Sequence, residues 1–512
     1  MLEKNNQEES VNQGLKLLAK SSVIVFVGLF LSKIFTYIYR IIIARYFGPE
    51  VYGLFSLAIM IMGLFIVIFS FGFIEGIVRF IPLYRGKKEF KKIRYLLKLS
   101  IIVLFFSSLT AAIILFFSAE FISLNIFHNS DLIIFLKIFS FLIPLLVYGN
   151  FFLSVLRGFE KIAWHSFIFN ILQNLIKLIV IIFLIFLGIK SNAIIFSHFA
   201  GILIVSIFSF LVCKYKLPEL FVKDKFNKKI KFKINKEFIL YSLPVMFTSI
   251  FSLIFSWIDS FSIGYFMGAL EVGFYNAAIP IVLLMTFVPE LFKQLFFPLI
   301  TREFSSKKLD VVKELSQQVG KWIFIFNLPL FLLVFIFPGA IINILFGAEY
   351  LVAENALRIL SVGFFVSSLI YISTNLVSMV GKSKIILINV VVTSIINIIL
   401  NFILVPIYGI NGAAISTTIV WILLSGLLLV EAKHYTSIIP IRRKMLKIFF
   451  VSLIPLVLLL LIKQFVVIKL VSLILLGGFF FLSYLFLIFI TNCFDKNDFM
   501  ILRTFKRKIL KI

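Results

Sequence analysis

Residues 45–58 read RYFGPEVYGLFSLA, and residues 265–278, 220 positions later, read YFMGALEVGFYNAA. When these stretches are aligned without a gap, Gly48 lies over Gly268 and Gly53 lies over Gly273. Weaker matches continue at shifts of 219 to 225, among them Asn174 with Asn397. Self-similarity at a fixed spacing indicates a repeated structural unit. The chain is therefore expected to consist of two related halves.

The composition on both sides of this repeat excludes a water-soluble protein. Of the 512 residues, 62% are hydrophobic and 14% are charged, whereas soluble domains have about 45–50% apolar and about 25% charged residues. The mean hydropathy is +1.13. Too few polar residues remain to cover a soluble surface, so most of the surface must face lipid.

Apolar runs of about 20 residues, the length that crosses a hydrocarbon core as a helix, occur fourteen times. The first follows a polar stretch, Met1 to Gln13, and at about 26 residues it is too long for a signal-peptide core. We expect it to be a retained span. The predicted spans are 19–44, 51–78, 97–118, 132–156, 162–187, 193–213, 238–264, 272–299, 320–338, 353–380, 385–405, 412–431, 445–462 and 470–491.

The basic residues predict the orientation of these spans. The chain has 50 Lys and Arg against 23 Asp and Glu, a net charge of +27. With the N-terminus inside, most of the Lys and Arg fall in inner loops and tails, as the positive-inside rule requires. Because they alternate with apolar runs instead of forming one polar face, a nucleic-acid partner is not expected. The protein is predicted to be a multi-pass cell-membrane protein with both termini cytoplasmic.

The repeat predicts how the spans are grouped. Spans one to six correspond to spans seven to twelve, and because six is even, both copies begin on the same side of the membrane. The copies are then parallel repeats about an axis along the membrane normal, an arrangement in which transporters bind substrate between the halves. The expected divisions are an N-terminal six-helix lobe at 1–213, a basic cytoplasmic linker at 214–236, a C-terminal six-helix lobe at 237–431, and two extra helices with a basic cytoplasmic tail at 432–512. The linker carries nine Lys and is expected to lie on anionic lipid headgroups.

Charged residues inside the first span are candidates for a substrate site. An ionisable side chain at the bilayer centre costs about 2.5–3.5 kcal/mol, so it usually faces a bundle interior. Lys33 lies near the midpoint of the span, and Arg40 lies seven residues later. At 3.6 residues per turn, Lys33, Tyr37 and Arg40 share one helix face.

Spans five and seven contain further candidates, the first two for the substrate site. Lys177 lies near the middle of the fifth span, with Asn174 one turn before it. Asp259 lies in the seventh span, and its repeat mate is Tyr39, next to Arg40. If the copies superpose, Asp259 and Arg40 face each other across the lobe interface. Asp259 is then either part of a structural salt bridge or a gate or ion-coupling group, and the sequence does not distinguish the two.

The remaining candidates are two pairs near the inner ends of spans two and eight. Glu75 precedes Arg79 by four residues, and Glu290 precedes Lys293 by three. Such spacings allow a local ion pair on one helix. Glu75, Glu290 and Lys293 are therefore either locally paired or, with Asp259, gate or ion-coupling groups.

No cofactor or metal site is predicted. Cys213 and Cys493 are 280 residues apart, so they suggest neither a disulfide framework nor a zinc cluster. The glycine-rich stretches 48–53 and 268–273 lack the Gly-Lys-Ser/Thr ending of an ATP-binding loop. They are expected to be short outer turns, and ATP hydrolysis is not expected.

Taken in order, several segments resemble a known family. The chain is similar to the polysaccharide transporter branch of the multidrug/oligosaccharidyl-lipid/polysaccharide exporter superfamily, which includes the O-antigen flippases. The similarity extends over nearly the whole chain. The segments that carry it are ARYFGPEVYGLFSLA at 44–58, DSFSIGYFMG at 259–268, VGFY at 272–275, LFGAEY at 345–350 and GINGAA at 409–414.

The resemblance implies an all-helical, two-lobed exporter that turns polyprenyl-(di)phosphate-linked oligosaccharides from the inner to the outer leaflet by alternating access. Coupling to an ion gradient, with H⁺ or Na⁺ as the ion, is expected from the resemblance. It also implies a cavity lined by spans one, two, seven and eight, which supply Lys33, Arg40, Glu75, Asp259, Glu290 and Lys293. Expected partners are the lipid-linked substrate, membrane lipids, and the glycan polymerases or glycosyltransferases that handle the same glycan.

Two other functions are open to a chain of this kind. A multidrug or cationic-compound antiporter of the same fold would place acidic groups at the midplane, where this chain has Lys33 and Lys177. A glycosyl polymerase or ligase would need a catalytic surface at the outer face, and the outer loops here are short. We therefore predict a non-enzymatic flippase for an anionic, lipid-linked glycan. The sequence leaves open the glycan, the polyprenol, the coupling ion and the oligomeric state.

Overall fold

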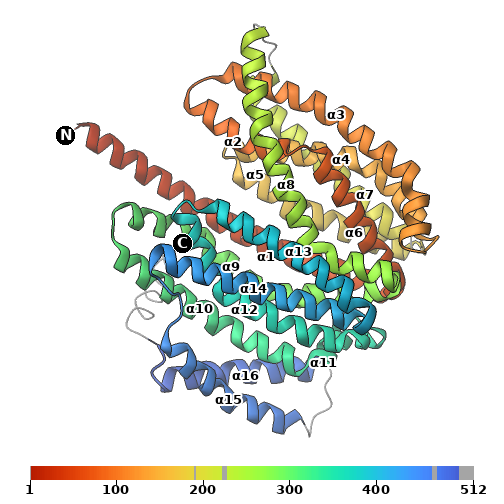
Figure 1. Cartoon of the computed structure of the whole chain (residues 1–512), viewed down its shortest axis with the longest axis vertical. Helices are drawn as coiled ribbons and strands as arrows, with labels where there is room; N and C mark the ends of the chain where they lie inside the picture. Colours follow the sequence, from red (N-terminus) through yellow and green to blue (C-terminus); the bar gives the residue numbers. More distant parts are fainter. Residues whose placement is uncertain (1, 190–191, 222–227, 464–469, 495–512) are drawn as a thin grey trace. The chain divides into compact units, whose positions relative to one another are not determined.

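The computed structural model describes residues 2–189, 192–221, 228–463 and 470–494. Within these ranges the chain is helical and contains no strand. Two π-helical turns interrupt the helices at Ile122–Ile126 and Phe167–Leu172. The helices, labelled as in Figure 1, are α1 Leu2–Phe69, α2 Phe73–Gly86, α3 Phe90–Phe121, α4 Leu132–Gly158, α5 Ile162–Ser166, α6 Gln173–Phe186, α7 Asn192–Lys216, α8 Lys228–Phe266, α9 Ala269–Ser305, α10 Leu309–Ile336, α11 Pro338–Leu345, α12 Glu354–Met379, α13 Ser383–Tyr408, α14 Ile410–Thr436, α15 Arg443–Lys463 and α16 Leu470–Ile490.

The helix lengths confirm an integral membrane protein. Thirteen helical segments of the described chain are long and apolar enough to cross a bilayer. The first of them, Phe30–Phe69, has 40 residues, about 60 Å at 1.5 Å per residue, which is twice the thickness of a hydrocarbon core. It therefore contains the second half of the first predicted span, 19–44, and most of the second, 51–78, in agreement with the predicted count of about fourteen.

Glycine marks the equivalent break in each repeat. Gly48 has φ +82° and ψ 172° and kinks α1, with Pro49 directly after it. Its repeat mate Gly268 has φ +108° and ends the turn between α8 and α9. A side chain is strongly disfavoured at positive φ, whereas glycine adopts it readily. The outer turns predicted at 48–53 and 268–273 thus begin where the backbone requires glycine.

Close contacts divide the chain into two compact units. The first contains Met1–Asn276 and Ser394–Ala413, and the second contains Ala277–Thr393 and Ala414–Ile512. This division follows local packing, so the lobe boundaries derived from the repeat stay a prediction. Residues 222–227 of the basic linker and the basic tail beyond Phe494 lie outside the described residues.

Small residues allow close helix packing in the first unit. A Cβ at Gly149 of α4 would lie 3.1 Å from the Ser206 Oγ of α7. Ser206 also donates to the Leu145 carbonyl at 2.5 Å, and the Cys213 thiol donates to the Phe152 carbonyl at 3.4 Å. Small and hydroxyl side chains bring membrane helices together because water is absent there and dispersion and hydrogen bonds provide the attraction.

The second unit contains a buried lysine that the sequence did not single out. Lys321 of α10 is fully buried, and its Nζ donates to the carbonyl oxygen of Cys493 at 3.4 Å, beyond the end of α16. Tyr484 of α16 donates to the Ile325 carbonyl at 3.1 Å. A cation near the carbonyl end of a helix is electrostatically favourable. The two contacts hold α16 against α10.

Candidate functional site

The two repeats meet at their matched glycines. A Cβ on Gly53 of α1 would overlap the carbonyl oxygen of Ala269, and a Cβ on Gly273 of α9 would overlap the carbonyl oxygen of Pro49. Pro49 and Ala269 are themselves 220 positions apart. Reciprocal contacts between equivalent residues are the signature of a twofold interface. The contact therefore places the pseudo-twofold axis between the start of α9 and the segment of α1 that follows the kink.

The predicted cationic face of α1 lies in the first unit, just before this crossing. Lys33, Tyr37 and Arg40 are each partly exposed. The Arg40 side chain hydrogen-bonds to the hydroxyl of Tyr52, which lies beyond the Gly48 kink. The Arg40 guanidinium thus hydrogen-bonds to a residue of the same helix that lies on the other side of the kink.

Lys177 and Asn174 extend this cluster from α6, which follows the π-helical turn. Asn174 donates from Nδ2 to the Ser32 Oγ at 3.0 Å, next to Lys33. A Cβ on Gly201 of α7 would collide with the Lys177 side chain, so the lysine occupies the space that the glycine leaves. Lys177 lies close enough to Arg40 for their charges to repel. Three predicted residues, Arg40, Asn174 and Lys177, therefore meet at the α1–α6 contact, and Lys33 follows Ser32 in α1.

Asp259 forms a second cluster in the same unit. Its side chain is 7% exposed. The Tyr275 hydroxyl donates to Oδ2 at 2.6 Å, and Asn401 Nδ2 of α13 donates to Oδ1 at 3.0 Å. Asn401 also donates to Oδ1 of Asn397 at 3.0 Å, and its own Oδ1 is buried without a hydrogen-bond partner. The result is a buried carboxylate whose two oxygens each accept a hydrogen bond, next to an amide whose oxygen has no partner.

The matching position in the first repeat is less polar. The mates of Asp259 and Tyr275 are Tyr39 and Phe55, whose rings contact edge to face with centroids 6.3 Å apart. The Tyr39 hydroxyl hydrogen-bonds to Ser197 of α7 at 3.0 Å. The second copy therefore has a carboxylate hydrogen-bonded to a hydroxyl where the first copy has two aromatic rings in contact. The acidic site is specific to one repeat.

A short polar chain joins the two clusters across the repeat axis. Tyr52, the partner of Arg40, donates to the carbonyl of Asn276 at 3.2 Å. Asn276 donates from Nδ2 to the Ser260 Oγ at 3.0 Å, and Ser260 follows Asp259 in α8. The cationic face and the carboxylate are therefore linked through Tyr52 and Asn276. The predicted direct pairing of Arg40 with Asp259 stays a prediction.

Glu75 and Arg79 do not form the local ion pair considered above. Both side chains are exposed on α2. The Arg79 guanidinium carbon instead lies 4.1 Å from the centroid of the Tyr241 ring of α8. Within the described residues of the first unit, this cation–π contact replaces the pair with Glu75, since an aromatic face attracts a cation within about 6 Å.

Glu290 and Lys293 lie in the second unit, on the C-terminal half of α9. Lys293 is exposed, with its Nζ 5.9 Å from the centroid of the Tyr371 ring of α12, and Glu290 is close enough to Tyr371 to influence it electrostatically. No group of three or more His, Cys, Asp or Glu that fits a metal ion occurs in the described part of the chain.

Several residues of the site were not predicted from sequence. Tyr52, Tyr275, Asn276 and Asn401 each contact a predicted residue or connect two of them. One sequence feature could have identified Asn401: it follows Asn397 by four residues, which places two amides on one face of a strongly apolar helix. The repeat alignment also pairs Tyr275 with Phe55, so it shows that the second copy has a phenolic hydroxyl where the first copy has none.

Comparison with known proteins gives consistent matches. A family model described as "Polysaccharide biosynthesis protein" matches residues 18–304, and a model described as "MatE" matches residues 244–403. A protein of Shigella flexneri named "Putative O-antigen transporter" is 26% identical over 397 residues, 76% of this chain and 90% of its own. A protein of Haloferax volcanii named "Probable low-salt glycan biosynthesis flippase" is 24% identical over 232 residues, 45% of this chain and 47% of its own.

Solved structures share the fold at low identity. The lipid II flippase in an inward closed conformation superposes with a TM-score of 0.70 and 21% identity, over 90% of this chain and 98% of that chain. An inward-facing multidrug resistance transporter gives a TM-score of 0.68 and 13% identity, over 81% and 98% respectively. At such identities the likeness shows the fold alone.

Proposed function

Since the chain belongs to the polysaccharide biosynthesis protein family of the multidrug/oligosaccharidyl-lipid/polysaccharide exporter superfamily, we propose that it flips polyprenyl-(di)phosphate-linked oligosaccharide from the inner to the outer leaflet. Relatives named as an O-antigen transporter and a glycan biosynthesis flippase support this substrate class. The membrane orientation that we propose has both termini in the cytoplasm. Glycosyltransferases would then build the substrate inside, and a polymerase or ligase would receive it outside.

The single observation that carries the proposal is the cation cluster between α1 and α6. Arg40 and Lys177 lie within repulsive range of each other, and Lys33 shares the helix face of Arg40. Like charges at short range are unfavourable in a low-dielectric interior, and a bound anion relieves that repulsion. Guanidinium and ammonium groups are the usual partners of phosphate. An anionic headgroup therefore suits this cluster better than a cationic drug does.

Asp259 is the proposed site of the coupling ion. A carboxylate with amide and hydroxyl neighbours binds either a proton or Na⁺. The unpartnered Oδ1 of Asn401 supplies a further oxygen of the kind that hard cations prefer. Because Tyr52 and Asn276 connect this group to Arg40, occupation of one cluster would alter the hydrogen bonding of the other.

Flipping into liposomes tests the proposed function. The protein is reconstituted with a fluorescent polyprenyl-diphosphate disaccharide, and protection of the headgroup from an external quencher is followed under an imposed Na⁺ or H⁺ gradient. We expect protection to rise in proteoliposomes with one of the two gradients and to stay at the background level in empty liposomes. Transport of cationic dyes without any transport of the lipid-linked sugar would favour the multidrug alternative and overturn the proposal.

Replacing Asp259 with asparagine is expected to remove the response to the ion gradient. The amide keeps the shape of the side chain but neither ionises nor balances a cation. We expect gradient-driven flipping to fall by about tenfold or more, since hydrogen bonds and contacts to a charged group contribute about 1.5–3 kcal/mol, while binding of the lipid-linked sugar is retained. The measurement is the flipping rate with and without the gradient.

Asp310→Asn is the matched control, because Asp310 is exposed at the start of α10. It should leave the gradient response unchanged. A full gradient response in the Asp259→Asn variant would show that the coupling ion binds elsewhere.

A further inference from the structure

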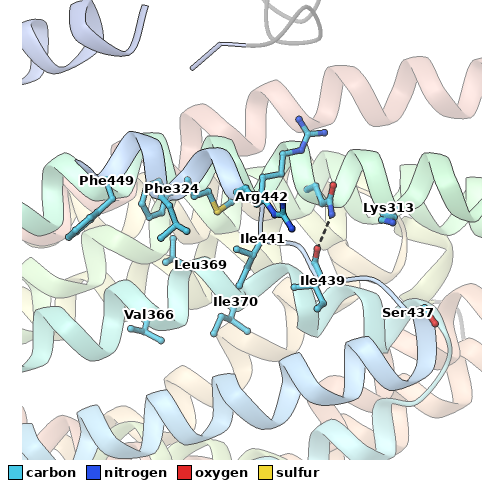
Figure 2. Close-up of a pocket in the computed structure, with 14 residues that line it drawn as sticks. Lys313, Phe324, Val366, Leu369, Ile370, Ser437, Ile439, Ile441, Arg442 and Phe449 are labelled. Atoms are coloured by element: carbon cyan, nitrogen blue, oxygen red, sulfur yellow. Dashed lines mark hydrogen bonds between the residues drawn. The ribbon is translucent and has the colours of Figure 1, made fainter. Parts of the chain in front are cut away.

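The second unit contains a pocket whose lining includes none of the residues proposed above for transport. It lies between α10, α12 and the turn at 437–442 that leads into α15 (Figure 2). Its volume is about 820 Å³, within the range of about 300–1,000 Å³ typical of small-molecule sites. The Gln317 side chain donates to the Ile439 carbonyl at 3.3 Å and fixes the turn against α10.

The two ends of this α10–α15 pocket differ in polarity. In Figure 2, Phe449, Phe324, Leu369 and Val366 gather at one end, whereas Lys313 and Ser437 lie at the other. The pocket is therefore amphipathic along its length. That is the polarity pattern of a lipid, with a headgroup at one end and chains at the other.

The apolar side chains of the pocket are accessible from outside. Ile439, Ile441 and Leu446 are 37%, 46% and 65% exposed, although all three line the pocket. A membrane protein presents such side chains to acyl chains at no cost, whereas in water they would form an unfavourable apolar patch. The pocket is thus suited to a ligand that arrives from the bilayer.

The charged residues that line the pocket are basic. They are Lys313, Arg442 and Arg443, and no Asp or Glu is among the lining residues. Arg442 donates from Nη1 to the Gln318 Oε1 at 2.9 Å, which orients the guanidinium. Arg443 is also the first residue of α15, so the N-terminus of a 21-residue helix borders the pocket. Helix N-termini favour anions, and basic pockets between membrane helices bind anionic headgroups.

We propose that the α10–α15 pocket is a binding site for an anionic glycerophospholipid, whose phosphate lies between Lys313, Arg442 and Arg443 and whose acyl chains follow the apolar end. The bilayer supplies such lipids in large excess over any lipid-linked glycan, and occupancy follows concentration by mass action. None of its lining residues belongs to the two clusters proposed for transport, and its occupant is a constituent of the membrane.

Native mass spectrometry of the delipidated full-length protein tests the proposal, with dioleoyl phosphatidylglycerol and dioleoyl phosphatidylethanolamine as probes. Wild-type protein should bind phosphatidylglycerol more tightly. The double variant Lys313→Gln/Arg443→Gln retains Arg442 and its bond to Gln318. Its binding of phosphatidylglycerol should weaken by roughly tenfold, because each basic group strengthens the binding of an anionic lipid. Binding of phosphatidylethanolamine should change little.

Lys384→Gln/Lys433→Gln is the matched control, because both lysines are exposed in the same unit but lie outside the pocket. Leu369→Trp is the second test, since it fills the apolar end and should reduce binding of both lipids while leaving the basic end intact. Equal loss in the control, no preference between the two headgroups, or unaltered binding in Leu369→Trp would each overturn the proposal. Displacement of phosphatidylglycerol by equimolar undecaprenyl phosphate would also overturn it, because the pocket would then belong to the transported carrier.

Discussion

Export of the glycan is expected to fall by about a hundredfold or more when Lys33 and Arg40 are both replaced with glutamine. Each cation, if it holds the headgroup phosphate, provides charge-assisted hydrogen bonds of about 1.5–3 kcal/mol, and a loss of 1.4 kcal/mol is a factor of ten. Glutamine keeps a similar length and a polar end, so the change removes charge more than shape. The measurements are surface glycan in cells and flipping in liposomes.

Two controls separate this effect from loss of folding. Lys137 of α4 is also a partly buried lysine in a membrane helix, but its Nζ lies 5.6 Å from the centroid of the Phe116 ring, so Lys137→Gln should leave export normal. Arg40→Lys keeps the charge but loses the planar fork that binds phosphate through two bonds, and it should retain an intermediate rate. Normal export in the Lys33→Gln/Arg40→Gln protein at wild-type abundance would eliminate this assignment.

Replacing Gly53 with alanine is expected to prevent the close approach of α1 and α9. The added Cβ would overlap the carbonyl oxygen of Ala269 and would come within 2.9 Å of the Gly273 nitrogen. Both atoms belong to backbone, which cannot move aside as a flexible side chain does. Overpacking of this kind costs about 1–3 kcal/mol. If the crossing must form and separate during each transport cycle, the flipping rate should fall by about tenfold or more.

The reciprocal geometry provides an internal check on this second prediction. Gly273→Ala should have a similar effect, because its Cβ would overlap the Pro49 carbonyl in the same way. Gly63→Ala on the same helix is the control, since its nearest neighbour is a Leu253 methyl at 3.4 Å, an ordinary contact. The thermal unfolding midpoint and the flipping rate are measured for all three variants. Wild-type values for both Gly53→Ala and Gly273→Ala would show that the crossing is not tightly closed.

Tyr52 connects the cationic face of α1 with the glycine crossing of α1 and α9. Tyr52 contacts Arg40 on one side and the Asn276 carbonyl on the other, and it lies one residue before Gly53. Separation of α1 from α9 would therefore also break the hydrogen bond to Asn276. The cationic face, the glycine crossing and the Asp259 cluster are for this reason expected to change together.

Much of the architecture followed from the sequence. The lengths of the apolar runs predicted membrane helices, and the repeat predicted two copies around an axis, because hydrophobic length and self-similarity are properties of the chain itself. The spacing of Lys33, Tyr37 and Arg40 predicted a shared face, because helical periodicity is local. Even the positive-φ glycines at 48 and 268 were recognisable as turns from their neighbours.

Contacts between distant segments were determined only by the tertiary structure. Asp259 meets Asn401 across 142 residues, Lys177 fills the space left by Gly201, and Arg79 contacts Tyr241 instead of Glu75. A sequence pattern records which side chains share one helix face, but in a chain of similar apolar helices almost any two faces are compatible by hydrophobicity. Which faces meet depends on close fit, chiefly where glycine and serine let backbones approach, and on the need to satisfy each buried polar group with a specific partner.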